Sequence, residues 1–117
     1  VLLEANSNLN SNDSNVTGIA LDGAYIGGIP VVINGQTLNQ EATNQGIMSF
    51  GNDSTGIYTI NGASAENQGI ITLGNSSVGI YGSGAGTGIS NTNKITIGGD
   101  SVGLFLEDMR YLELGRK

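Results

Sequence analysis

A stretch of 15 residues occurs three times in this chain at nearly constant spacing. The copies are Asn44–Tyr58, Asn67–Tyr81 and Asn91–Phe105, and they read NQGIMSFGNDSTGIY, NQGIITLGNSSVGIY and NTNKITIGGDSVGLF. The second copy matches the first at 10 of 15 positions, the third matches the second at 7, and the offsets are 23 and 24 residues. A period of this size is typical of repeat proteins, in which each unit buries its apolar face only by stacking on its neighbours.

The composition agrees with a folded array and excludes several classes of function. A chain of 117 residues that is 38% hydrophobic and 12% charged has the length of about one domain and is too apolar for a disordered segment. Its net charge of −6 argues against a basic patch for nucleic acid or for an anionic membrane. Without His or Cys, neither a Ser–His nor a Cys–His pair can form, and zinc would have only carboxylate ligands. We expect no cofactor and no metal.

Each copy predicts two short strands separated by a glycine-centred turn. In the first copy the strands are Met48–Phe50 and Thr55–Tyr58, and the residues between them are Gly, Asn, Asp and Ser, which favour turns. Strict alternation also directs Thr55 inward. The predicted interior comprises Met48, Phe50, Ile57, Ile71, Leu73, Val78, Ile80, Ile95, Ile97, Val102 and Leu104.

Short strands at this period, with no helical pattern between them, predict an all-β fold: a parallel β-solenoid of about five rungs, each rising roughly 4.8 Å. The leucine-rich repeat, which has a similar period, is excluded because its leucine pattern is absent. The regular rungs cover residues 44–105 and irregular rungs cover 1–43. Gly18 lies 38 residues before Gly56, so we expect one enlarged rung there, with Ile29–Gly35 as an extra apolar strand.

The two ends of the chain differ from the repeats. Val1–Asn15 is rich in Asn and Ser and predicts an exposed loop. Residues 107–117 hold six of the 14 charges, and their apolar spacing is compatible with a short capping helix, with the start of a neighbouring domain or with a frayed tail. Because the chain begins at Val1, we expect it to be a piece of a longer protein.

Stacking in register would turn repeated residues into columns along the solenoid. Three columns are predicted to be structural, with asparagine amides bonding along the axis and glycines allowing close packing. They contain Asn44, Asn67 and Asn91; Ser54, Ser77 and Ser101; and Gly56, Gly79 and Gly103. The aromatic column, Tyr58, Tyr81 and Phe105, should face outward. It is either a contact surface for a sugar or a protein, or a stacked ladder that adds stability.

Asp53 and Asp100 are the candidates for catalysis. Two rungs apart in one column they would lie roughly 9–10 Å apart, at the edge of the range for inverting glycosidases of about 6.5–9.5 Å. Both occupy turns, however, where aspartate commonly accepts backbone hydrogen bonds. A polysaccharide lyase or inverting hydrolase therefore remains the alternative to a non-enzymatic role.

The repeat pattern resembles the passenger regions of large autotransporter adhesins, particularly the fusobacterial type. The resemblance rests on Ile-Thr-x-Gly followed by Ser-Val-Gly-Ile-Tyr, covers 44–105 well and residues 12–19 weakly, and does not include the tail. It implies a right-handed β-helix that passes through the outer membrane by means of a C-terminal β-barrel that this chain lacks. No catalytic residues are carried over from the family.

The same resemblance implies a location and a class of partner. We expect an extracellular segment at the bacterial cell surface, a structural stalk that binds host or bacterial surface proteins or glycans. We expect no nucleic acid as partner and no membrane contact by this segment itself. The net charge of −6 favours a neutral glycan or a basic protein patch as the ligand.

Overall fold

The computed structural model describes residues 1–23, 25–38 and 40–107, and every regular element in them is a β-strand. Twelve strands form the stacked body of the molecule. They are β1 (Leu2–Leu3), β2 (Asn8–Asn10), β3 (Thr17–Asp22), β8 (Glu41–Asn44), β9 (Ile47–Ser49), β10 (Thr55–Ile60), β11 (Ser64–Asn67), β12 (Ile70–Thr72), β13 (Val78–Ser83), β14 (Gly88–Asn91), β15 (Lys94–Thr96) and β16 (Val102–Glu107).

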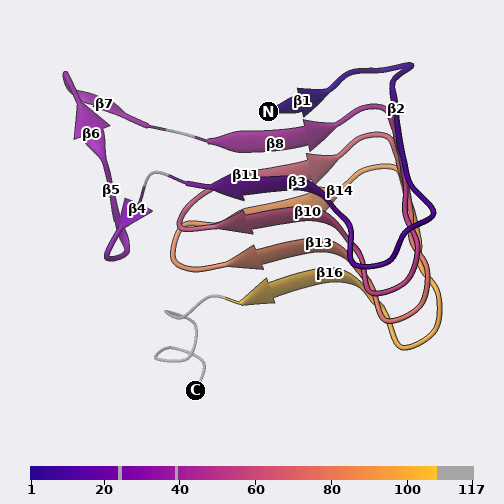
Figure 1. Cartoon of the computed structure of the whole chain (residues 1–117). Coiled ribbons are helices and arrows are strands. Elements are labelled where there is room, and N and C mark those ends of the chain that lie inside the picture. Colours follow the sequence, from indigo (N-terminus) through magenta and orange to yellow (C-terminus); the bar gives the residue numbers. More distant parts are fainter. Residues whose placement is uncertain (24, 39, 108–117) are drawn as a thin grey trace.

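These strands form three parallel four-stranded sheets, as predicted for a β-solenoid. Sheet A has the order β1-β8-β11-β14, sheet B the order β2-β9-β12-β15, and sheet C the order β3-β10-β13-β16. Each rung contributes one strand to every sheet, so the chain passes from A to B to C and then steps to the next rung (Figure 1). The described residues contain four rungs rather than about five.

The prediction of an enlarged first rung is confirmed. Thr17 pairs with Thr55 and Ile19 pairs with Ile57, so the offset of 38 residues is one rung plus an insertion. The insertion is not an extra strand of the solenoid, as Ile29–Gly35 was predicted to be. It forms two small antiparallel hairpins beside the body, β4 (Tyr25–Ile26) with β5 (Ile29–Pro30) and β6 (Val32–Ile33) with β7 (Gln36–Thr37).

A further prediction about the first rung is wrong, and the connectors hold strands that the sequence did not indicate. The N-terminal segment Val1–Asn15 is not a loop, because β1 and β2 lie in it and pair with β8 and β9. The connectors between copies hold β11 and β14, which form sheet A together with β1 and β8. The expected charged tail falls outside the described residues except for Glu107, which ends β16.

The core lies inside the triangle of sheets and matches most of the predicted interior. Met48, Phe50, Ile57, Ile71, Leu73 and Ile80 are buried, and Ile95 and Ile97 pack against them as partly buried residues. Ala42 and Ala65 of sheet A complete the centre. Leu104, predicted inside, is 45% exposed because it belongs to the last described rung.

Thr55, Val78 and Val102 are not core residues, contrary to the prediction. Val102 is 40% exposed, and the other two are half-buried. Alternation breaks at the glycine that follows each of them: Gly56 and Ile57 are both buried, and a Cβ on Gly56 would meet the Ile71 side chain. This break moves the preceding residue out of the core.

Candidate functional site

The aromatic column forms a stacked row on the outside of sheet C, as predicted. Tyr58, Tyr81 and Phe105 occupy paired positions on β10, β13 and β16. The Tyr58 and Tyr81 ring centroids are 5.1 Å apart at an interplanar angle of 5°, and those of Tyr81 and Phe105 are 5.4 Å apart at 31°. Tyr58 is 39% exposed and Phe105 is 37% exposed, while Tyr81 between them is half-buried. We call these three residues the aromatic row.

The stacking decides which part of each ring a partner could reach. Nearly parallel rings at this separation cover each other's faces, so the row presents ring edges to solvent. The neighbour of Tyr58 on the first rung is Ala20, which ends the row on that side. A sugar that stacks on a ring face would therefore find the inner faces of the row already occupied.

An acidic side chain is hydrogen-bonded to the aromatic row. The Tyr81 hydroxyl donates a hydrogen bond of 2.6 Å to Oε1 of Glu107, at the end of β16. This bond, together with partial burial of the phenol, raises the pKa of Tyr81 above its usual value of 10.0, because the carboxylate accepts from the protonated hydroxyl. The row thus combines aromatic edges with a negatively charged acceptor.

The asparagine column is the ladder that the repeat predicted. Asn44 and Asn67 are fully buried; Nδ2 of Asn44 donates to Oδ1 of Asn67 at 2.8 Å, and Nδ2 of Asn67 donates to Oδ1 of Asn91 at 2.8 Å. Each Oδ1 also accepts the backbone N–H two residues later, at Gly46, Gly69 or Asn93. The ladder therefore satisfies the turn between sheets A and B, which is a structural role.

The serine and glycine columns are structural in the same sense. The backbone N–H of Ser54 donates to Oγ of Ser77, and that of Ser77 donates to Oγ of Ser101, while Ser54 and Ser77 are 1% exposed. A Cβ on Gly79 would come within 2.5 Å of the Gly103 carbonyl oxygen and 2.8 Å of Ile95. This close approach of consecutive rungs requires glycine.

Asp53 and Asp100 share a column with Ser76 between them, at an exposed turn. The backbone φ angle is 55° at both Asp53 and Asp100, and it is 57° at Ser76. Asp and Asn tolerate this left-handed conformation better than most side chains. The backbone conformation thus accounts for these residue types without a catalytic pair. Among the described residues no three Asp or Glu side chains gather into a metal-binding cluster.

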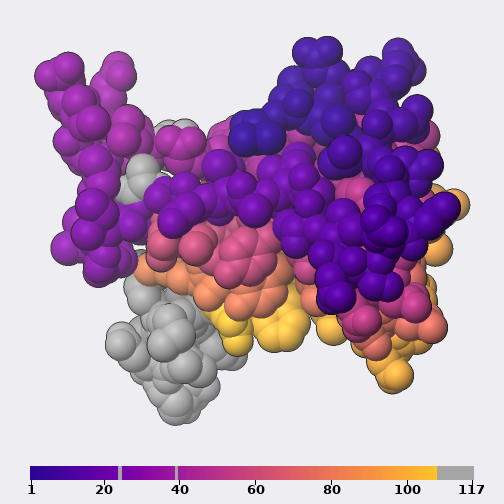
Figure 2. Space-filling view, in the orientation of Figure 1, coloured from indigo at the N-terminus to yellow at the C-terminus, as the bar shows by residue number. Residues whose placement is uncertain are grey.

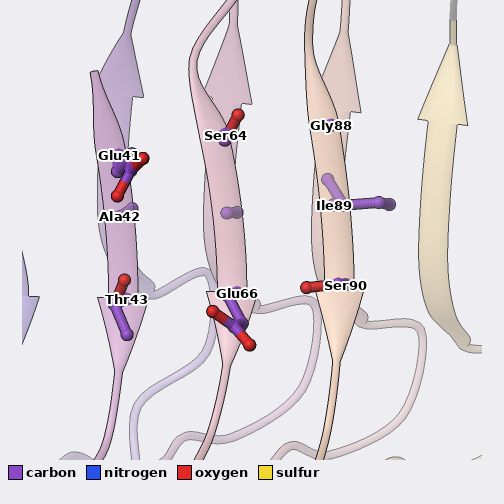
Figure 3. Close-up of a pocket in the computed structure, with 9 residues that line it drawn as sticks. Glu41, Ala42, Thr43, Ser64, Glu66, Gly88, Ile89 and Ser90 are labelled. Atoms are coloured by element: carbon purple, nitrogen blue, oxygen red, sulfur yellow. The ribbon is translucent and has the colours of Figure 1, made fainter. Parts of the chain in front are cut away.

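Sheet A carries an open hollow that the sequence did not indicate. It has a volume of about 330 Å³ and is lined by Glu41, Ala42, Thr43, Ser64, Ala65, Glu66, Gly88, Ile89 and Ser90. Figure 3 shows these side chains on three neighbouring strands, β8, β11 and β14. Oε1 of Glu66 accepts from Gln68, and Oε1 of Gln68 accepts from Gln45. The hollow offers carboxylate and hydroxyl groups beside apolar side chains such as Ile89.

The insertion forms an uncharged apolar arm, which we define as residues 25–38. Both of its two-residue turns, Gly27-Gly28 and Asn34-Gly35, have positive φ throughout, as hairpins of this kind require. The arm projects from the side of the body (Figure 2), and its exposed apolar residues are Ile26, Ile29, Val32 and Ile33. At its base the Tyr25 ring covers Gly62 and Gly86, where any side chain would collide with it.

Comparison with protein-family models, with curated proteins and with solved structures yields no match to this chain. The described residues include no helix long and apolar enough to span a membrane.

Proposed function

We propose that this chain is a structural and adhesive segment of a secreted bacterial surface protein, a β-helical stalk that presents contact surfaces to other cells. The observation that carries the proposal is the in-register stack of four rungs, in which each inner rung is bonded to a neighbour on both sides in all three sheets. The interior is filled by side chains such as Met48, Ile57 and Ile71. Contacts with partners then belong to the outer surface.

Among the outer surfaces, the aromatic row is the proposed contact site, and a basic patch on a partner protein is the proposed ligand. Ring edges, the Tyr58 hydroxyl and the Glu107 carboxylate suit lysine and arginine side chains, and the net charge of −6 favours their approach. Stacking of a neutral sugar is less favoured because the rings already cover each other's faces.

The proposal is tested by the binding of the purified chain to intact bacterial and host cells. We expect Tyr58→Ala and Glu107→Gln each to weaken binding about tenfold or more, as at an interface hot spot, and added salt to weaken it further. Ile47→Ala is the matched control, since Ile47 is 43% exposed on sheet B, away from the row.

Equal binding by the parent and both variants would remove the row from the proposal. Binding that resists salt and is competed by neutral oligosaccharides would instead identify a glycan ligand. Cleavage of a polysaccharide by the chain, abolished by Asp53→Asn, would replace adhesion with the enzymatic alternative.

A further inference from the structure

The outer face of sheet A is hollowed because several of its outward side chains are short. Strand pairing gives two outward columns, one of Glu41, Ser64 and Gly88 and one of Thr43, Glu66 and Ser90 (Figure 3). Gly88 leaves a gap in its column, since a Cβ built there would have only Oγ of Ser64 within 4 Å, at 3.9 Å. The volume of about 330 Å³ lies within the range of small-molecule sites, about 300–1,000 Å³.

This hollow belongs to the side of the solenoid and not to one of its ends. The residues between its outward side chains, Ala42 and Ala65, face the core and are buried. Its strands β8 and β11 are paired on both sides, β8 with β1 and β11, and β11 with β8 and β14. A further rung would stack on the free edge of β14 and would leave the outward side chains of β8 and β11 uncovered.

Two carboxylates stand at opposite corners of the hollow. Glu41 and Glu66 are one rung and two residues apart, so roughly 8 Å separates their Cα atoms. The Glu66 carboxylate accepts from the uncharged amide of Gln68, and the Val1 amino group binds the Glu41 carbonyl and not its carboxylate. Among the described residues the one Lys or Arg is Lys94, which lies on sheet B. The hollow therefore favours a cationic ligand.

We infer that the hollow binds an amino sugar. The ammonium group of the sugar pairs with the carboxylate of Glu41 or Glu66. Its ring hydroxyls exchange hydrogen bonds with the hydroxyls of Thr43, Ser64 and Ser90, which both donate and accept.

Other small ligands fit this set of groups less well. A polyamine would pair with the carboxylates but would cover the protein hydroxyls without giving them partners. A neutral sugar would leave the carboxylates without a cation, and an acidic sugar would be repelled by them. The hollow lies on sheet A and the aromatic row on sheet C, so this is a second binding surface, beyond the proposed function.

Isothermal titration calorimetry of the full chain with a trimer of glucosamine tests this inference. The matched probe is the N-acetylated trimer, which keeps the sugar rings and their hydroxyls but has no ammonium groups. The titration is run at about pH 6, below the ordinary pKa of an amine and above that of a carboxyl group. We expect the amine form to bind, and the acetylated form to bind about tenfold more weakly or not at all.

Variants of the hollow locate the binding. Glu41→Gln and Glu66→Gln should each weaken binding of the amine form about three- to tenfold, since each removes one partly exposed charge. Gly88→Tyr should abolish binding, because the ring would fill the hollow from a position with space for a side chain. Asp13→Asn is the matched control, since it removes the same charge from an exposed position between β2 and β3.

Several outcomes would overturn the inference. They are a parent that binds neither trimer, equal binding of the two trimers, equal binding of spermidine, which has ammonium groups but no hydroxyls, and parental affinity in both glutamine variants. An equal loss in Asp13→Asn and Glu66→Gln would show that net charge and not the hollow attracts the amine. The glutamine variants keep the side-chain shape, so they decide the matter even if Gly88→Tyr fails to fold. Failure here would leave the aromatic row untouched, because that surface is tested separately with Tyr58→Ala on cells.

Discussion

At the scale of single residues, the asparagine ladder shows how a buried amide becomes part of the framework. Asn67 donates to Asn91 and to the Lys94 carbonyl, and it accepts from Asn44 and from the Gly69 N–H. Among the described residues, every buried side-chain nitrogen and oxygen has a hydrogen-bond partner. Removing the Asn67 amide would therefore take a hydrogen bond from groups on both neighbouring rungs.

We therefore expect Asn67→Ala to lower the free energy of unfolding by about 1–3 kcal/mol, the range for an unsatisfied buried polar group. Asn91→Ala is the matched control and should cost less, because Asn91 is exposed on the last described rung. Urea denaturation followed by circular dichroism measures both. Equal stability of Asn67→Ala and the parent would show that the ladder contributes nothing to folding.

The glycine column allows a second comparison at this scale. A Cβ on Gly79 would press against the Gly103 carbonyl and Ile95, whereas a Cβ on Gly103 would meet nothing within 4 Å. Gly79→Ala should therefore destabilise the chain by about 1–3 kcal/mol, as overpacking does, while Gly103→Ala should be nearly neutral. The same urea denaturation assay measures the free energy of unfolding of both variants. Comparable losses of unfolding free energy in both variants would mean that the destabilisation comes from the change in backbone freedom and not from a clash between two rungs.

At the scale of elements, the arm is joined to the body through contacts of Tyr25 at its base. The Tyr25 ring lies over Gly62 and Gly86, and the Tyr25 N–H donates to the Asn61 carbonyl. We expect Tyr25→Ala to free the arm while the four rungs stay folded. Limited proteolysis should then cut within residues 26–38 faster than in the parent, with unfolding of the body unchanged. Unaltered cleavage would show that the hairpins hold the arm in place without the ring.

The elements also show what the sequence could predict and why. The repeat located sheets B and C, the buried residues of the two inner rungs and the outward aromatic row, because apolar residues alternate strongly there. Sheet A was missed because its two inner strands, β8 and β11, turn inward only small or polar residues, Ala42 with Asn44 and Ala65 with Asn67. The arm was missed although Asn34-Gly35 between apolar residues is a strong hairpin signal.

The remaining errors have two physical origins. Thr55, Val78 and Val102 were assigned to the core by strict alternation, which the glycine after each of them interrupts. Leu104 was assigned by analogy with the inner rungs, although the last described rung has a described neighbour on one side only. The aromatic row was located from the sequence, but the covering of its ring faces is visible only in three dimensions.

At the scale of the whole molecule, the direction of the hydrogen bonds determines how the stack would respond to force. The bonds between rungs run across the strands, and so lie along the axis of the solenoid. Tension applied along that axis loads one terminal rung at a time instead of shearing many bonds together. We expect rungs to peel off singly, each regular rung releasing roughly 80 Å of chain from its 23 or 24 residues, and the enlarged first rung releasing more. Single-molecule stretching would record regular extensions of that size, and one abrupt rupture of the whole stack would refute this. A stalk of this design would lengthen under load before its attachment is lost.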